Sequence, residues 1–214
     1  MIKKESQHII KRIIDIVIST IMLIIAFPFL VLIGILIKID TKGPAFFKQK
    51  RVGKGEKVFT TYKFRTMVEN VKRINSKNKL EKNDPHITII GKYLRWGIDE
   101  LPQLFNVLKG NMSLVGPRPT VPNHVKRYSK WEKRRLEVKP GITGWVIING
   151  RNLLSWPERI KLDIWYIDHW SLWLDFRILI KTIVVIFFTR KGIYGKDGVN
   201  WGYLASKENE NDVK

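Results

Sequence analysis

The 214-residue sequence contains no cysteine. A disulfide, a thiolate nucleophile, an iron–sulfur cluster and a cysteine-ligated zinc site are therefore excluded, so any covalent catalysis must use another side chain. Neither a Gly-x-x-x-x-Gly-Lys-Ser/Thr loop nor a Gly-x-Gly-x-x-Gly turn occurs, which removes the two common glycine-rich phosphate sites. The histidines form no ligand-spaced pair, which argues against a histidine-based zinc site: His8, His86, His124 and His169.

Acidic residues are scarce, with 19 Asp and Glu against 39 Lys and Arg and a formal net charge of +20. This excess predicts attraction to polyanions such as nucleic acid, anionic lipid or phosphorylated substrates. Eight tryptophans could stack on bases, so a basic membrane-associated or nucleic-acid-binding protein without catalysis is the alternative to an enzyme. The length suits one catalytic domain with at most a second small subdomain.

One long apolar segment, residues 16–37, carries no charge and is long enough to cross a hydrocarbon core. Pro28 near its middle predicts a kink, because proline lacks an N–H donor and clashes with the preceding turn. Basic residues flank the segment on both sides, which favours a helix–break–helix hairpin that enters and leaves by the same leaflet. A spanning helix is the other interpretation. The basic flanks are Lys3, Lys4, Lys11 and Arg12 before it, and Lys38, Lys42, Lys48, Lys50 and Arg51 after it.

Two extended runs follow, residues 45–52 and 58–66, joined by a glycine-containing turn that predicts a β-hairpin. Lys63 and Arg65 are two residues apart and so share one strand face, which could meet an anion. A solvated basic edge strand is the alternative. Residues 68–84 are polar, and Asp84-Pro85 marks a turn.

An acidic pair, Asp99-Glu100, stands at the start of a predicted helix. Asp99 suits the N-cap, Gly110 suits the end, and apolar residues between them recur at helical spacing. Acids in a first helical turn more often cap than catalyse. Nearby basic residues favour chemistry, because a carboxylate at a helix N-terminus can attack phosphorus and a neighbouring one can hold Mg²⁺. These basic residues are Lys63, Arg65, Arg95 and the proline-flanked Arg118, whose guanidinium suits bidentate phosphate binding.

The C-terminal part begins with a capping box, Ser155 to Glu158, that predicts a helix through about Tyr166. Residues 172–188 are almost wholly apolar and predict either an interfacial or a buried helix. Aromatic residues typical of a membrane–water boundary precede them: Trp165, Tyr166, Trp170 and Trp173. Residues 205–214 form a polar tail.

Ordered motifs along nearly the whole chain resemble the bacterial monotopic phosphoglycosyl transferases, the catalytic domain of undecaprenyl-phosphate sugar phosphotransferases, in its minimal form. The motifs are Lys11-Arg12 with Asp15, Gly43-Pro44, Gln49-x-Arg51-x-Gly53, residues 63–67 (Lys-Phe-Arg-Thr-Met), Asp84-Pro85-x-Ile87-Thr88, Leu94-Arg95, residues 99–103 (Asp-Glu-Leu-Pro-Gln), residues 110–119 ending in Gly-Pro-Arg-Pro, residues 140–144 (Pro-Gly-Ile-Thr-Gly), and Asp175 with Thr182.

The resemblance implies a two-step, Mg²⁺-dependent polyprenyl-phosphate sugar-1-phosphate transferase that starts glycan assembly. Asp99 would attack the sugar-bearing phosphate of a UDP-sugar, UMP would leave, and the phosphosugar-aspartyl intermediate would react with undecaprenyl phosphate. Glu100 would bind Mg²⁺, and Arg118 would hold phosphate. Lys63, Arg65 and Arg95 are further candidates for binding substrate anions. His86 and Phe27 stand where the family more often has Arg and Ser.

The expected fold is mainly α with a small β-hairpin. Residues 1–40 would form a re-entrant membrane helix, residues 41–204 a catalytic domain with interfacial helices on the cytoplasmic face of the inner membrane, and residues 205–214 the tail. Lipids, the UDP-sugar donor and undecaprenyl phosphate are the expected partners, and nucleic acid is not. The sequence gives no indication of which sugar is carried.

Overall fold

The computed structural model describes residues 4–68, 86–95 and 97–189. In this part of the chain helices predominate, and the strands form two small two-stranded sheets. The expectation of a mainly α fold with a small β-hairpin is confirmed. The predicted turn at Asp84-Pro85 and the polar tail at 205–214 lie outside the described residues.

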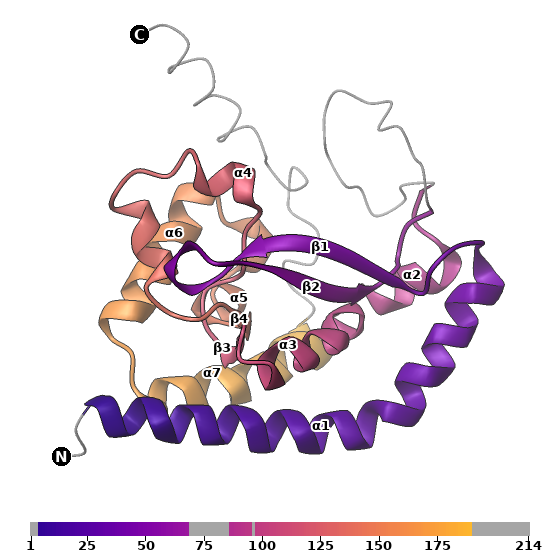
Figure 1. Cartoon of the computed structure of the whole chain (residues 1–214), viewed down its shortest axis with the longest axis horizontal. Helices are drawn as coiled ribbons and strands as arrows, with labels where there is room; N and C mark the ends of the chain where they lie inside the picture. The colour runs from indigo at the N-terminus through magenta and orange to yellow at the C-terminus, as the bar shows by residue number, and fades with distance from the viewer. Residues whose placement is uncertain (1–3, 69–85, 96, 190–214) are drawn as a thin grey trace, which may run out of the picture.

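The longest element is helix α1, Lys4–Asp40. It is one continuous helix with Pro28 inside, whereas a break between two helices was predicted. Figure 1 shows that α1 bends, so that its end near β1 rises away from the line of its N-terminal part. The helix therefore continues on both sides of Pro28, which itself donates no backbone hydrogen bond, and α1 changes direction by bending without a break.

Only a narrow stripe of α1 is buried against the rest of the protein. Its positions are spaced by four or seven residues, which places them on one helix face: Asp15, Ser19, Leu23, Leu30 and Ile37. Many of the other apolar side chains point outward, among them Ile24, Ile25, Phe27 and Phe29, each more than 60% exposed. Residues 5–40 are long and apolar enough to cross a membrane, and 11% of their apolar window is buried.

The predicted hairpin is present. Strand β1, Phe46–Val52, pairs antiparallel with β2, Val58–Phe64, around the short helix η1, Lys54–Glu56. Both strands are slightly shorter than the sequence predicted, and Arg65 lies just beyond the end of β2. The hairpin runs above α1 in Figure 1. It brings the Lys63 ammonium within 2.5 Å of the Glu100 carboxylate.

The helix that was predicted to begin at Asp99 has its N-cap two residues earlier, at Gly97. A 3₁₀ segment, η2, Ile98–Gln103, leads directly into α3, Leu104–Leu108. Its N-cap is Gly97, with φ 118°, and not Asp99 as predicted. Glycine adopts this left-handed conformation without the steric cost of a Cβ. As a consequence Asp99 and Glu100 lie within the first turn, where their carboxylates are free of a capping role. Gly110, with φ 84°, follows the end of α3 as predicted.

A small parallel sheet that the sequence analysis did not predict brings two distant loops together. Strand β3, Ser113–Val115, pairs with β4, Gly141–Thr143. The backbones pass so close that a Cβ on Gly116 would overlap the Lys139 carbonyl, and one on Gly141 would overlap the Gly116 nitrogen. Only glycine allows this approach, which fixes the chain two residues before Arg118.

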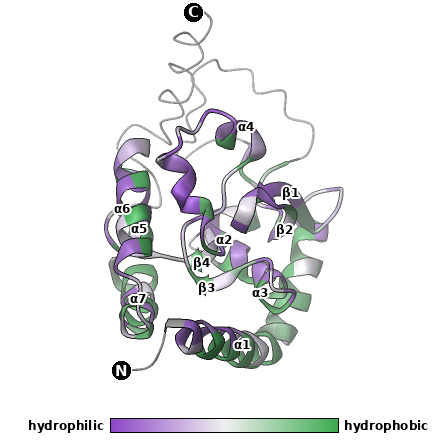
Figure 2. Cartoon of the chain, turned by 60° about the vertical axis from the view of Figure 1, so that its left-hand side comes forward, coloured by the Kyte–Doolittle hydropathy of each residue, from purple (hydrophilic) through white to green (hydrophobic). Residues whose placement is uncertain are grey.

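The remaining elements pack above α1 and around these loops. Helix α6 opens on the predicted capping box formed by Ser155 and Glu158, and α7 is capped by Ser171. Both views place α7 beside α1, at the end of the molecule opposite α4 (Figures 1 and 2). Their bounds are α2 Ile89–Leu94, α4 Pro122–Val125, η3 Glu132–Leu136, α5 Trp145–Ile148, η4 Arg151–Leu153, α6 Trp156–Asp168, α7 Leu172–Val184 and a π-helical turn, η5, Val185–Thr189.

Candidate active site

The centre of the candidate site is the adjacent carboxylate pair on η2. Glu100 is buried, and its carboxylate accepts hydrogen bonds from Lys63 at 2.5 Å and from both terminal nitrogens of Arg118, at 2.5 and 3.1 Å. Burial by itself raises the pKa of Glu100, but the charges of Arg118 and Lys63 outweigh burial and hold that pKa well below its usual value. Glu100 is therefore a permanent anion that orients two cations.

Asp99 is in a different electrostatic environment from its neighbour. Within the described part of the chain its half-buried carboxylate makes no side-chain hydrogen bond or close ion pair. Burial, and then the negative charge of Glu100, raise the pKa of Asp99 to about 6, against the opposing effects of Lys63 and Arg118. Asp99 is thus mostly ionised at neutral pH but poorly stabilised as an anion. A carboxylate of this kind is suited to nucleophilic attack.

Two cations that the sequence analysis did not assign to the site also act on this pair. Arg51, on β1, has its pKa lowered to about 10, first by burial and then by the charge of Arg118. Burial and Arg118 also lower the pKa of Arg151, while Glu100 and Asp99 raise it. Positive charge around the two carboxylates is therefore in excess, and an anionic ligand would relieve it.

Both of these arginines had a sequence signal that could have drawn attention to them. Arg51 is part of the Gln-x-Arg-x-Gly motif, although its position in a strand does not reveal what it faces. Arg151 follows Asn149-Gly150, a turn dipeptide, and itself has a positive φ of 51°. A non-glycine residue in this region is uncommon and marks a backbone held in place by its surroundings.

The structure does not bring every predicted site residue to the carboxylate pair. The Arg65 guanidinium is buried and donates to the carbonyl oxygens of Thr41 and Lys42 and to the Thr41 hydroxyl, at 2.7 to 2.9 Å. It also donates to the Ile37 carbonyl in the last turn of α1, at 3.4 Å, and so caps the C-terminal end of that helix. Arg95 is half-buried at the end of α2, where its backbone N–H bonds to the Gly91 carbonyl.

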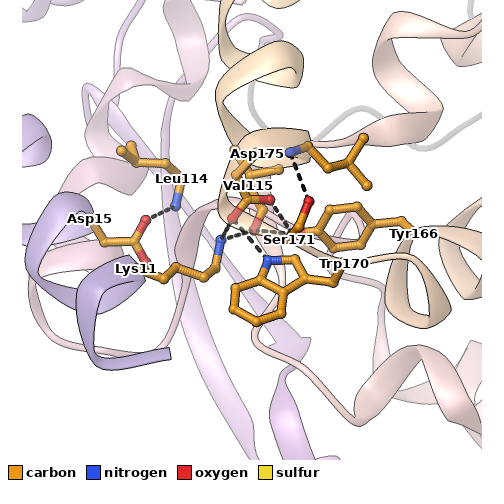
Figure 3. A network of polar contacts seen from close by, with 9 residues as sticks. Lys11, Asp15, Leu114, Val115, Tyr166, Trp170, Ser171 and Asp175 are labelled. Carbon is orange, nitrogen blue, oxygen red and sulfur yellow. Dashed lines mark hydrogen bonds and ion pairs between the residues drawn. The ribbon is translucent and has the colours of Figure 1, made fainter. Parts of the chain in front are cut away.

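A second polar network ties the N-terminal turns of α1 to the part of the chain that carries the site (Figure 3). Lys11 donates to Asp175 at 2.5 Å and to the Val115 carbonyl at 3.0 Å. Asp175 also accepts from Tyr166 at 2.6 Å and from Trp170 at 3.0 Å. Tyr166 is only 2% exposed, so it belongs to the core and not to an exposed aromatic belt.

The neighbouring arginine on α1 links that helix to the acidic pair. Arg12 donates to the carbonyls of Val107 and Leu108, at 2.6 and 2.9 Å, and so caps the C-terminus of α3. Because α3 continues η2 without a gap, the cap sets the position of the Asp99–Glu100 turn relative to α1. The apolar helix and the carboxylates are thereby held in one rigid arrangement.

We expect Asp175→Asn to lower the free energy of unfolding by about 3 kcal/mol, because it leaves the partly buried Lys11 ammonium without its counter-charge. Thermal unfolding in detergent measures the change, and the double variant Lys11→Met/Asp175→Asn should recover part of the loss. Glu56→Gln is the control, since the Lys133–Glu56 pair is exposed and its loss should cost less than about 1 kcal/mol. Equal effects of the two carboxylate substitutions would contradict the anchoring role.

Comparison with known proteins adds an independent observation. The model of the bacterial sugar transferase family matches residues 6–189. The uncharacterized sugar transferase EpsL of Bacillus subtilis is 44% identical over 176 residues, which cover 82% of this chain and 86% of EpsL.

Longer relatives match over a similar stretch. The undecaprenyl-phosphate galactose phosphotransferase of Salmonella typhimurium is 42% identical over 206 residues, covering 89% of this chain and 43% of that protein. The UDP-glucose:undecaprenyl-phosphate glucose-1-phosphate transferase of Escherichia coli is 39% identical over 188 residues, covering 83% of this chain and 40% of that protein. This chain therefore spans less than half the length of these two relatives.

Proposed function

Because the chain belongs to the bacterial sugar transferase family, we propose that it transfers a sugar 1-phosphate from a UDP-sugar to undecaprenyl phosphate, with release of UMP. The names of the Salmonella and Escherichia coli relatives both specify undecaprenyl phosphate and a hexose, and the Escherichia coli name also specifies UDP-glucose as donor, which supports the substrate class. The observation that carries the proposal is the contrast between the two carboxylates: Glu100 is fixed by Lys63 and Arg118, while Asp99 beside it lacks such stabilisation. The transfer would start assembly of a glycan.

The proposed reaction proceeds in two displacements at phosphorus. First, an oxygen of the ionised Asp99 carboxylate forms a bond to the sugar-bearing phosphorus, and the bond between this phosphorus and the bridging oxygen breaks, so that UMP leaves with the electron pair. Second, a phosphate oxygen of undecaprenyl phosphate attacks the same phosphorus and the Asp99–phosphorus bond breaks. The carboxylate is regenerated, and the product is the polyprenyl diphosphate sugar.

The cations around Asp99 support a diphosphate ligand. Glu100 takes one N–H from each terminal nitrogen of Arg118, which leaves further N–H donors on the guanidinium, and the side chain is 43% exposed, so solvent and substrate can reach it. Arg51 and Arg151 add positive charge at the same site, which favours the dianionic donor and the charge that develops on the leaving phosphate. Lys63 is held against Glu100 and is a further contact to substrate anions. Arg65 already donates to α1, so we do not assign it a substrate contact.

These residues are compatible with Mg²⁺ if substrate phosphates and water supply most of its ligands. The described residues contain no cluster of three or more side chains that could hold a metal by themselves. The Glu100 carboxylate is ionised, and its two oxygens accept three hydrogen bonds, so acceptor capacity remains. Mg²⁺ commonly takes one or two carboxylates and completes its shell with substrate phosphates and water. Glu100 would be the ligand, and the bound ion would neutralise the diphosphate.

The exposed apolar surface supports a site at the lipid headgroups of the inner membrane, facing the cytoplasm. On α1 most apolar side chains point away from the protein, and α7, which lies at the same end of the molecule, exposes Trp173 and Phe176 by 66% and 52%. Such surfaces are stable in contact with lipid. The bend of α1 is compatible with a helix that enters and leaves by one leaflet, and a membrane-bound acceptor would then reach Asp99 directly.

The direct test is to supply the purified chain with undecaprenyl phosphate, Mg²⁺ and a panel of UDP-sugars, beginning with UDP-glucose and UDP-galactose. We expect continuous release of UMP with at least one donor only when the acceptor is present in excess, whereas without acceptor at most one UMP should be released per protein molecule. With the acceptor withheld, a donor labelled in the sugar should leave its label on the protein. Absence of both UMP and labelled protein across the panel would refute the proposal.

A further inference from the structure

The loop that carries Arg118 is held through its backbone, one carbonyl after another. The Arg118 carbonyl accepts from Arg135 at 3.3 Å, the Pro119 carbonyl from Arg51 at 3.2 Å, and the Thr120 carbonyl from the Val52 amide at 2.9 Å. Pro119 also restricts Arg118 to extended backbone conformations. The prolines therefore fix the local shape of the loop, whereas these three donors fix its position relative to Glu100.

Arg135 is itself held on several sides. Its side chain is buried and forms an ion pair of 2.6 Å with the buried Asp163 on α6. A second terminal nitrogen donates to the Tyr128 hydroxyl at 2.6 Å. The guanidinium also lies 5.7 Å from the ring centre of Tyr128 and 5.4 Å from that of Trp156. Its orientation is thus set by η3, α6 and the segment after α4 together.

We propose that Arg135, oriented by Asp163, is a positioning residue for the transfer reaction: it fixes the Arg118 carbonyl so that the Arg118 guanidinium meets Glu100 and the donor phosphate. The inference rests on the proposed function for its kinetic consequence. A buried ion pair is weak evidence for a gain in stability, because the desolvation of both charges offsets their attraction. Holding the Arg118 loop in one position is a function that the Arg135–Asp163 pair can have even if it adds nothing to the stability of the fold.

Two variants separate positioning from a purely structural ion pair. Arg135→Met/Asp163→Leu removes both charges, so that neither is left buried and unpaired, and we expect its Tm to stay near that of the original chain. Arg135→Lys retains a charge for Asp163 but lacks the planar fork that reaches Tyr128 and the Arg118 carbonyl at once. For both variants we expect KM for the UDP-sugar to rise about tenfold with a smaller change in kcat.

The chain offers a matched control one residue away. Arg134 and Asp168 form an ion pair of 2.5 Å between the same two elements, η3 and α6, but both side chains are more than a third exposed. Arg134→Met/Asp168→Leu should leave KM unchanged. A KM unchanged in Arg135→Lys, or one that rises equally in the control, would overturn the positioning role.

A second measurement does not depend on turnover. In ¹⁵N NMR of the arginine side chains, rotation of the Arg118 guanidinium should be slow in the original chain, because Glu100 holds both of its terminal nitrogens. It should become faster in both Arg135 variants and stay slow in the control, with the Arg118 signal assigned through Arg118→Lys. Unchanged rotation would refute the positioning inference even if no donor reacts. If every donor fails while rotation is slow in the original chain and faster in both Arg135 variants, the result counts against the proposed function alone.

Discussion

Asp99→Asn should lower the rate of UMP release by about 10⁴-fold or more, because the amide oxygen cannot form the covalent intermediate that divides the reaction into two displacements. The measurement is UMP release under saturating donor and acceptor, together with retention of labelled sugar phosphate on the protein when acceptor is withheld. Both should disappear. The control is Asp168→Asn, which removes an exposed carboxylate of α6 and should leave both signals intact.

The same substitution should not weaken the fold. Because the pKa of Asp99 is raised to about 6 in the folded chain, its folded state binds more protons than the unfolded state between about pH 4 and 6. Stability therefore falls as pH rises through this window and stays lower above it. In EDTA at pH 7.5 the Asp99→Asn variant should have a Tm equal to or above that of the original chain, with the difference closing below pH 4. A large loss of Tm would mean that Asp99 has a structural role.

Glu100→Gln should lower kcat/KM by about 10³-fold, because the neutral amide loses the charge that holds Lys63 and Arg118 in place. If Glu100 also binds the metal, the Mg²⁺ concentration for half-maximal residual activity should rise. Titrating Mg²⁺ in both proteins distinguishes the two roles: an unchanged requirement assigns Glu100 to orienting the cations only. Glu137→Gln, at an exposed surface position, is the control and should have no effect on either quantity. Near-normal turnover in Glu100→Gln would contradict its place in the site.

Stability and activity are expected to conflict at this turn. Gly97 allows η2 to start without a capping side chain. The negative charges of Asp99 and Glu100 repel each other, and Glu100 raises the pKa of Asp99. The cations that relieve this repulsion come from β2, the loop after β3, β1 and η4, all distant in sequence. The cost of placing two like charges side by side is therefore offset by the rest of the fold.

Local sequence rules were sufficient for several elements. The capping box at Ser155 and Glu158, the hairpin around residues 53–57 and the glycine after α3 depend on neighbours within a few residues, and each was predicted correctly. The N-cap at Asp99 was predicted wrongly, since the N-cap is the left-handed Gly97, two residues earlier, and sequence spacing does not report φ. A kink was predicted at Pro28 between two helices; α1 does bend along its length, but it is one continuous helix.

The amino-acid sequence alone was enough to establish which groups are available: no thiol, a long apolar segment, an acidic pair and an excess of cations, arranged in motifs that identify the family. Which of the cations surround the acidic pair depends on how distant segments pack together. Lys63 reaches Glu100 but Arg65, two residues later, caps α1, because the strand ends between them. The charges of Arg51 and Arg151 act at the site although both residues lie about 50 positions from the acidic pair in the chain, and proximity over that separation leaves no periodic pattern in the sequence.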